Sequence, residues 1–171
     1  MTRIMAGAAV ALMLFAGAGC SAVAADDDAA REARDRAEIE SLMWRYVRAL
    51  DTADADGYAA VYTPDGQFSA GTNATKGRDA LRKMVADIGQ RRTEAEAKGQ
   101  PQAPMYHMIM NEHLEFVDED HARMHSYWQT VFGAVGETPV RVAAAGRGVD
   151  ELVRVDGQWL IQSRNVAPTT E

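Results

Sequence analysis

Residues 39–51 read IESLMWRYVRALD, and their apolar side chains recur with the period of an α-helix. The apolar positions lie three or four residues apart and share one face: Ile39, Leu42, Met43, Tyr46, Val47 and Leu50. This spacing predicts a helix that packs on a hydrophobic core, with the phenol of Tyr46 pointing inward.

Asp51 directly follows this apolar face, where the negative end of the helix dipole disfavours a carboxylate. Another interaction must therefore stabilise it. In one interpretation Asp51 caps a second helix, which opens at residues 51–54, runs toward Tyr62 and ends before Pro64. In the other, Asp51 orients a histidine from elsewhere in the chain.

The rest of the chain predicts a third helix and then a series of strands. The expected elements are a short strand at 66–69, a loop at 71–75, a helix from about Arg78 to Glu94, an extended link at 101–104, strands from Met105 onward that turn at 118–120 and 133–139, and strands at 141–145, 149–155 and 158–165. Asp156-Gly157 is a typical two-residue hairpin turn. Helices followed by strands predict an α+β fold, with about three helices packed on one face of a curved antiparallel sheet.

The N-terminus predicts export. Residues 4–15 form an apolar run of 12 residues after a single positive charge, shorter than the roughly 20 residues of a membrane-spanning helix. Residues 1–24 are therefore predicted to be a secretion signal, cleaved either before Ala25 or, as in bacterial lipoproteins, before Cys20. The protein is expected to be periplasmic or secreted, with a membrane anchor only on the lipoprotein route. Residues 25–35 form a charged lead-in, 36–167 one domain and 168–171 a tail.

Composition narrows the chemistry of the folded domain. Cys20 is the only cysteine, so the domain has no disulfide, thiolate catalysis or cysteine-ligated metal. The chain carries 18 Lys and Arg against 25 Asp and Glu, a net charge of −7. Because nucleic-acid binding requires a basic surface, this balance argues against a nucleic-acid partner.

Residues 36–167 resemble the SnoaL-like branch of the nuclear transport factor 2-like superfamily. The resemblance is carried by the order and spacing of residues 39–51, 62–66, 77–81, His107 with Asn111, and 150–161. It implies a cone-shaped, cystatin-like fold around an apolar pocket that binds a small hydrophobic molecule. It also implies a homodimer that uses the exposed face of the sheet.

Within this superfamily, the bile-acid 7α-dehydratases and scytalone dehydratase are most similar in the residues that carry chemistry. The bile-acid enzymes have a tyrosine, an aspartate and a histidine that fall on Tyr46, Asp51 and His107; scytalone dehydratase shares the last two. The second aspartate of the bile-acid enzymes falls near Thr130, and only Arg164 lies close to their late arginine. The resemblance therefore transfers only in part.

His107 is the predicted general base. It lies in a strand in which alternation places His107, Ile109 and Asn111 on one face. A histidine held by Asp51 can exchange protons near neutral pH, while Tyr46 donates a hydrogen bond to a carbonyl or developing enolate oxygen. These roles predict a dehydratase or isomerase that needs no cofactor.

The alternative is a non-catalytic module that binds a small molecule or forms dimers. In that case Tyr46 is an ordinary core tyrosine and Asp51 a helix cap.

Five further residues are predicted to contact the substrate: Arg164, Asn111, Trp128, Tyr62 and Phe68. Arg164 ends a Trp-x-Ile-x-x-Arg motif and is expected to pair with Asp51 or with a substrate carboxylate. Core packing is the alternative for the three aromatic residues, and hydrogen bonding at a strand end for Asn111. No metal site is predicted, because His121 and His125, four residues apart on a strand, would lie about 13 Å from each other.

Overall fold

The computed structural model describes residues 18–169, with side chains from residue 27 onward. The chain divides into two compact units, residues 1–34 and 35–171. In the first unit, residues 18–34 are helical and begin α1 (Ala18–Thr52), so the predicted lead-in is helical. The apolar run at residues 4–15 lies outside the described residues, and the secretion signal stays a prediction. Within residues 18–169, no helix has the length and hydropathy that a membrane span requires.

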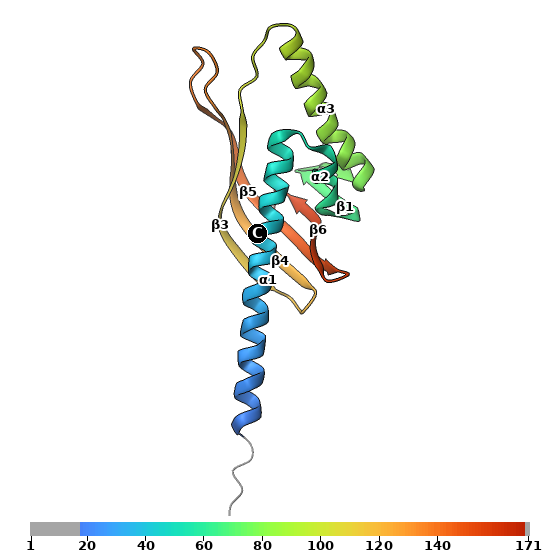
Figure 1. Ribbon diagram of the computed structural model, residues 1–171, viewed down its shortest axis with the longest axis vertical. Coiled ribbons are helices and arrows are strands. Elements are labelled where there is room, and N and C mark those ends of the chain that lie inside the picture. The colour runs from blue at the N-terminus through green and yellow to red at the C-terminus, as the bar shows by residue number, and fades with distance from the viewer. Residues whose placement is uncertain (1–17, 170–171) are drawn as a thin grey trace, which may run out of the picture. The chain divides into compact units, whose positions relative to one another are not determined.

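The second unit combines helices with a sheet (Figure 1). This sheet has six strands. After α1 the elements are α2 (Ala55–Ala60), β1 (Tyr62–Ala70), β2 (Asn73–Lys76), α3 (Arg78–Ala97), β3 (Met105–Phe116), β4 (His121–Phe132), β5 (Arg141–Val155) and β6 (Gln158–Asn165). The sheet order is β2-β1-β6-β5-β4-β3. Every neighbouring pair is antiparallel except β1 and β6, which are parallel. The predicted α+β class is confirmed.

The apolar face of α1 forms the centre of the core. All six predicted residues are buried, with 0–8% of their surface exposed. They pack with side chains from α2, α3 and the sheet, among them Tyr58, Leu81, Leu152 and Ile161. Tyr46 therefore points inward, as the helical spacing predicted.

Several predicted boundaries were wrong. β1 begins at Tyr62 rather than at Gly66, and α3 continues past Glu94 to Ala97. Part of the predicted loop at 71–75 forms β2, because Gly71, with a φ of 63°, makes the turn tight enough for β2 to pair back onto β1.

The region predicted as two strands, at 141–145 and 149–155, is the single strand β5. Gly146 and Gly148 lie between the two predicted segments. They lie within the strand because the indole of Trp128 covers Gly146: a Cβ on Gly146 would be 2.7 Å from the Trp128 ring. The glycine thus accommodates a close contact rather than ending the strand.

The turn between β5 and β6 confirms the Asp156-Gly157 prediction. Both residues have positive φ angles, 51° and 76°, which a type I′ hairpin turn requires.

The interpretation of Asp51 as the cap of α2 was wrong. α2 begins at Ala55, and its N-cap is Asp54, whose carboxylate accepts a hydrogen bond of 2.9 Å from the backbone N–H of Gly57. Asp51 therefore does not cap α2.

Asp54→Ala is expected to lower the free energy of unfolding by about 1 kcal/mol, because the Gly57 N–H loses its partner at the helix terminus. Urea denaturation measures the change. Asp56→Ala, in the first turn of the same helix, is the matched control and should have a smaller effect, because its ion pair with Arg82 is exposed. Equal losses in the two variants would contradict the assigned cap.

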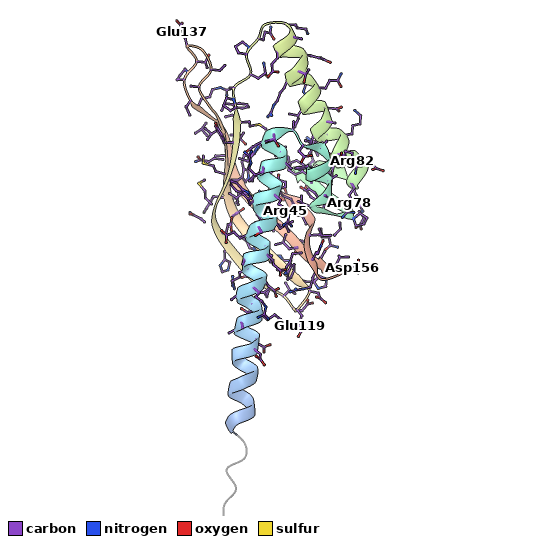
Figure 2. All side chains as sticks on the ribbon, viewed as in Figure 1. Arg45, Arg78, Arg82, Glu119, Glu137 and Asp156 are labelled. Atoms are coloured by element: carbon purple, nitrogen blue, oxygen red, sulfur yellow. The ribbon has the colours of Figure 1, made fainter. Side chains whose placement is uncertain are left out.

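Two arginines fix α3 against its neighbours (Figure 2). Arg78 Nε donates to the carbonyl oxygen of Tyr62 over 2.8 Å, and Arg82 Nε pairs with Asp56 over 2.7 Å. The first contact joins α3 to β1 and the second joins it to α2.

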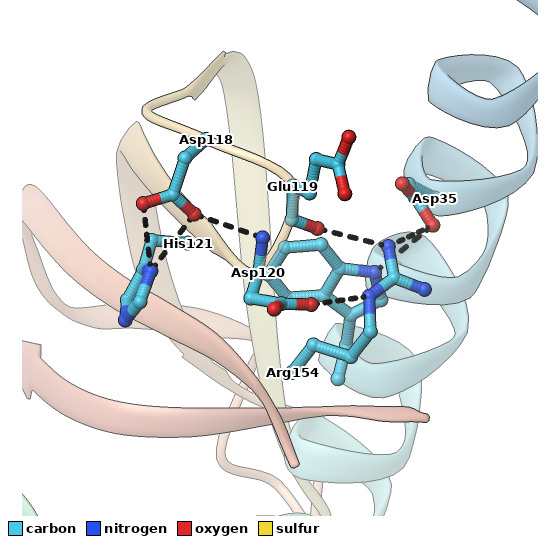
Figure 3. Close-up of polar contacts among 7 residues, drawn as sticks. Asp35, Asp118, Glu119, Asp120, His121 and Arg154 are labelled. Carbon is cyan, nitrogen blue, oxygen red and sulfur yellow. Dashed lines mark hydrogen bonds and ion pairs between the residues drawn. The ribbon is translucent and has the colours of Figure 1, made fainter. Parts of the chain in front are cut away.

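A polar cluster joins α1 to the β3–β4 turn and the β5–β6 hairpin (Figure 3). Buried Asp35 accepts a hydrogen bond from Trp159 Nε1 at 3.2 Å and forms an ion pair with Arg154 Nη2 at 2.5 Å. The Arg154 guanidinium lies 4.7 Å from the centroid of the Trp159 ring and also pairs with Asp120 at 3.4 Å. These contacts hold the part of α1 that begins at Asp35 against the sheet.

Candidate functional site

A cavity of about 210 Å³ lies between α1 and the sheet. Five of the predicted site residues line it: Tyr46, Phe68, His107, Trp128 and Arg164. Leu50, Ile109 and Val166 add apolar walls. The structure therefore brings together residues from α1, β1, β3, β4 and β6 that are far apart in the sequence.

Asp51 and His107 make direct contact at the edge of this cavity. Asp51 Oδ1 lies 2.7 Å from His107 Nδ1, and both carboxylate oxygens accept the backbone N–H of His107, at 3.1 and 3.2 Å. The Asp51 side chain is 7% exposed and that of His107 is 21% exposed. Because a carboxylate accepts hydrogen bonds, Nδ1 is the donor in this contact, which leaves Nε2 as the acceptor nitrogen of a neutral imidazole.

The fold explains why a carboxylate sits at the end of α1. β3 is the outermost strand of the sheet, so the His107 N–H has no neighbouring strand on that side. α1 ends beside this strand and supplies Asp51 as the acceptor. Arg92 Nη1 donates to the carbonyl oxygen of Asp51 over 2.7 Å, which satisfies one of the last carbonyl groups of the helix.

Tyr46 belongs to a cluster of three buried tyrosines. Its ring centroid lies 5.3 Å from that of Tyr58 and 6.3 Å from that of Tyr62. Burial raises the pKa of Tyr46, although the charge of Arg164 and a hydrogen bond with Tyr58 act in the opposite direction. The hydroxyl of Tyr46 is therefore protonated at neutral pH and is available as a donor.

Tyr62 is fully buried and contacts the other two tyrosines rather than lining the cavity. Its hydroxyl lies 3.2 Å from that of Tyr58. Tyr62 therefore packs against Tyr46 within the core.

Arg164 pairs with Asp150, a residue that the sequence analysis missed. Arg164 Nη1 donates to Asp150 Oδ2, and both side chains are buried. The guanidinium carbon lies 4.6 Å from the centroid of the Tyr46 ring. Arg164 was expected to pair with Asp51, but the ion pair that the structure shows is with Asp150.

Burial shifts the pKa values of both Asp150 and Arg164. Burial raises the pKa of Asp150 to about 6, even though Arg164 favours the ionised form. Burial alone would lower the pKa of Arg164, but Asp150, with Tyr46 and Tyr62, raises it above its usual range. At neutral pH both groups are charged, and Asp150 is the one that titrates under mild acid conditions.

This shift predicts how Asp150 affects stability. The unfolded carboxyl loses its proton near pH 4 and the folded one near pH 6, so between these values the unfolded chain binds fewer protons. The contribution of Asp150 to stability therefore falls as the pH rises from about 4 to about 6 and is constant above that window. Urea denaturation of the wild type and of Asp150→Asn at several pH values isolates it. The wild type should gain stability relative to the variant on acidification, and a relative loss would contradict the sign.

Asn111 lies away from the cavity. The pairing of β3 with β4 shifts between Met110 and His113, and Asn111 occupies this bulge with a φ of 52°. The bulge reverses the alternation, so the prediction that His107, Ile109 and Asn111 share one face was wrong for Asn111. Asn111 is exposed and lines a separate shallow cavity beside His113 and His125.

Trp128 is fixed as a wall of the cavity. Its indole Nε1 donates to the carbonyl oxygens of Arg147 and Val166, each at 3.0 Å. This double contact, together with the close approach to Gly146, holds the ring in one orientation.

Two of the three histidines outside the cavity contact acidic side chains, and the third, His125, lies against His113 with ring centroids 6.5 Å apart. His121 Nδ1 lies 2.8 Å from Asp118 (Figure 3), and His113 Nε2 lies 3.1 Å from Glu115. In residues 18–169, no three or more His, Cys, Asp or Glu side chains are grouped so that they could hold a metal ion.

Comparison with known families gives one match: a model of the SnoaL-like domain matches residues 31–165. No curated protein matches the chain significantly.

Solved structures show the same fold. A protein of unknown function from Mycobacterium tuberculosis is 25% identical, with 81% of this chain and 73% of that chain covered and a TM-score of 0.66. A protein named "Putative Scytalone Dehydratase" from Novosphingobium aromaticivorans is 26% identical, with 80% of this chain and 85% of that chain covered and a TM-score of 0.65. An NTF2-like protein with a cystatin-like fold from the same organism, 21% identical over 84% and 87% of the chains with a TM-score of 0.67, shows the fold alone.

Proposed function

This chain belongs to the SnoaL-like domain family, and on that basis we propose that it is a cofactor-independent dehydratase or isomerase that acts on a small hydrophobic oxygenated molecule. The observation that carries the proposal is the contact of 2.7 Å between Asp51 and His107 at the wall of an apolar cavity. A histidine fixed by a carboxylate, with its second nitrogen unprotonated, is a general base. The 26% identical structure named "Putative Scytalone Dehydratase" is consistent with this class of reaction.

In this mechanism His107 Nε2 removes a proton from a carbon next to a carbonyl group. The electrons of the C–H bond move toward the carbonyl oxygen, and the Tyr46 hydroxyl donates a hydrogen bond to that oxygen as its negative charge grows. In dehydration, the electrons then return to form a C=C bond and expel a neighbouring hydroxyl group, which takes the proton from His107 and leaves as water. In isomerisation, His107 returns the proton to a different carbon.

The side chains that line the cavity and its volume limit which ligands can fit. Phe68, Trp128 and Ile109 present apolar surface, and the volume of about 210 Å³ is smaller than the range of about 300–1,000 Å³ typical of pockets for drug-sized molecules. We therefore expect a compact substrate of one or two rings that carries a ketone and a hydroxyl group.

A thermal-shift screen of compact hydroxy ketones and their dehydrated products tests the proposal. A ligand that binds only the native state raises the apparent melting temperature. At least one hydroxy ketone should stabilise the protein, and absorbance should then record its conversion to a conjugated ketone. Stabilising ligands that are all recovered unchanged would contradict an enzymatic role.

One observation favours a non-catalytic binding module instead. Thr130 lines the cavity, and the second aspartate of the similar bile-acid dehydratases falls near this residue. A protein that only binds its ligand would need Tyr46 and Arg164 as contacts but would show no turnover in the same screen.

We also propose that the chain forms a homodimer through the outer face of the sheet. Tyr106, Tyr127 and Val142 are exposed by 46%, 53% and 59%. The strand register pairs Tyr106 with Val131 and Val131 with Val142, so these three side chains form one apolar row across β3, β4 and β5. Light scattering should give the mass of a dimer, which Val142→Glu should halve and Val117→Glu, in the β3–β4 turn, should not. A monomeric wild type would contradict the proposal.

Export is likewise a proposal. Mass spectrometry of the mature protein should find a chain that begins at Ala25 or a lipid-modified Cys20. A chain that retains residues 1–19 would contradict both routes.

A further inference from the structure

The polar corner of the cavity is formed by Tyr46 and Arg164. Both line the cavity, whereas Asp150, which holds Arg164, is fully buried behind it. The buried pair is neutral as a whole, but its positive member lies toward the cavity. A ligand in this corner therefore encounters the guanidinium and the phenolic hydroxyl before it encounters the carboxylate.

The pair is incompletely hydrogen-bonded. Within residues 18–169, Asp150 Oδ1 and Arg164 Nε are buried and lack a hydrogen-bond partner. Buried polar atoms without partners cost free energy, and each one in a native structure needs an explanation, such as a catalytic role or a bound ion.

The surroundings of Asp150 favour its neutral form. Burial is the largest of these effects, and the negative charges of Glu112 from β3 and Glu151 from β5 add to it, while Tyr46 and Tyr62 act electrostatically on Arg164. Arg164, from β6, is the group that favours the ionised carboxylate. A second anion that competes for Arg164 would therefore favour protonation of Asp150.

We infer that the corner formed by Tyr46 and Arg164 binds a phenolate or enolate oxygen, and that Asp150 takes up one proton when this oxyanion binds. Two anions beside a single cation in an apolar cavity would leave one negative charge uncompensated. Transfer of a proton from solvent to Asp150 leaves Arg164 paired with the ligand oxygen, so the net charge of the buried group is zero before and after binding. This inference rests on the site of the proposed function and adds the ionisation state of its ligand.

The cost of this proton uptake is small. Because burial raises the pKa of Asp150 to about 6, protonating it at pH 7 costs about a factor of ten in affinity. An ordinary surface aspartate would cost about a factor of a thousand at the same pH. Asp150 is thus suited to exchange its proton for a ligand charge near neutrality.

Isothermal titration calorimetry with dinitrophenolate tests the inference on the wild-type protein at about pH 7. Repeating the titration in buffers with different ionisation enthalpies gives the number of protons taken up, which should be close to one per ligand bound. The matched neutral probe is dinitroanisole, in which a methyl group replaces the negative charge. It should bind more weakly and without proton uptake; an ether that binds as tightly as the phenolate overturns the inference.

Two variants assign the proton. Asp150→Asn should lose the uptake and bind dinitrophenolate up to about tenfold more tightly at pH 7, because Arg164 no longer has a competing anion. His107 also borders the cavity, so His107→Asn is the control and should retain the uptake. Uptake that disappears in His107→Asn overturns the assignment to Asp150, and this arm can overturn it even if Asp150→Asn does not fold. Catalysis is judged separately by turnover: an active enzyme that binds the phenolate without proton uptake refutes only this inference.

Discussion

His107→Ala is expected to lower the turnover of an identified substrate by a factor of about 10²–10⁴ while the protein remains folded. The variant removes the nitrogen that accepts the proton, but His107 is partly exposed, and the backbone N–H of residue 107 still donates to the Asp51 carboxylate. Steady-state kinetics measure the loss, and the melting temperature should change by only a few degrees.

His121→Ala is the matched control for this variant. His121 contacts Asp118 at the β3–β4 turn, outside the cavity, in a geometry similar to that of His107 with Asp51. It should keep full activity. If His107→Ala unfolds the protein or retains its activity, the assignment of the general base is wrong.

Arg164→Met is expected to lower the free energy of unfolding by about 3–5 kcal/mol at neutral pH, because it leaves the Asp150 carboxylate buried without its cation. Urea denaturation measures this change. Arg123→Met is the control: Arg123 pairs with Glu151 over 2.7 Å on the exposed surface, and the loss should be much smaller.

The double variant Asp150→Val with Arg164→Met distinguishes an unpaired charge from a loss of packing. Replacing both members of a buried pair by apolar residues removes the unpaired charge, so most of the lost stability should return. A double variant as unstable as the sum of its parts would show that the packing of the arginine, rather than its charge, stabilises this region.

The sequence predicted the structure best where one hydrophobic repeat continues over several consecutive turns of a helix. The stripe from Ile39 to Leu50 correctly predicted α1, its buried face and the inward direction of Tyr46, because about three helical turns leave little ambiguity. The same stripe placed Asp51 at the end of the helix. The sequence could not show which of two roles Asp51 has, because that depends on an edge strand 56 residues later.

Two local irregularities were not predictable from alternation. In β3, the bulge at Asn111 moves that residue out of the face that carries His107. In the β5–β6 hairpin, counting back from the Asp156-Gly157 turn places Val149 opposite Arg164. An irregularity between Glu151 and Leu152 instead pairs Asp150 with Arg164, which is why the buried ion pair was missed.

The most direct test of His107 as the base is solvent deuterium exchange into a bound ketone. The protein is incubated in D₂O with a ketone ligand found by thermal shift, and mass spectrometry follows deuterium at the carbon next to the carbonyl. If His107 moves a proton at that carbon, the wild type should exchange it at least about 10²-fold faster than His107→Ala, with His121→Ala equal to the wild type. Exchange at the same rate in the wild type and His107→Ala would contradict the assigned mechanism.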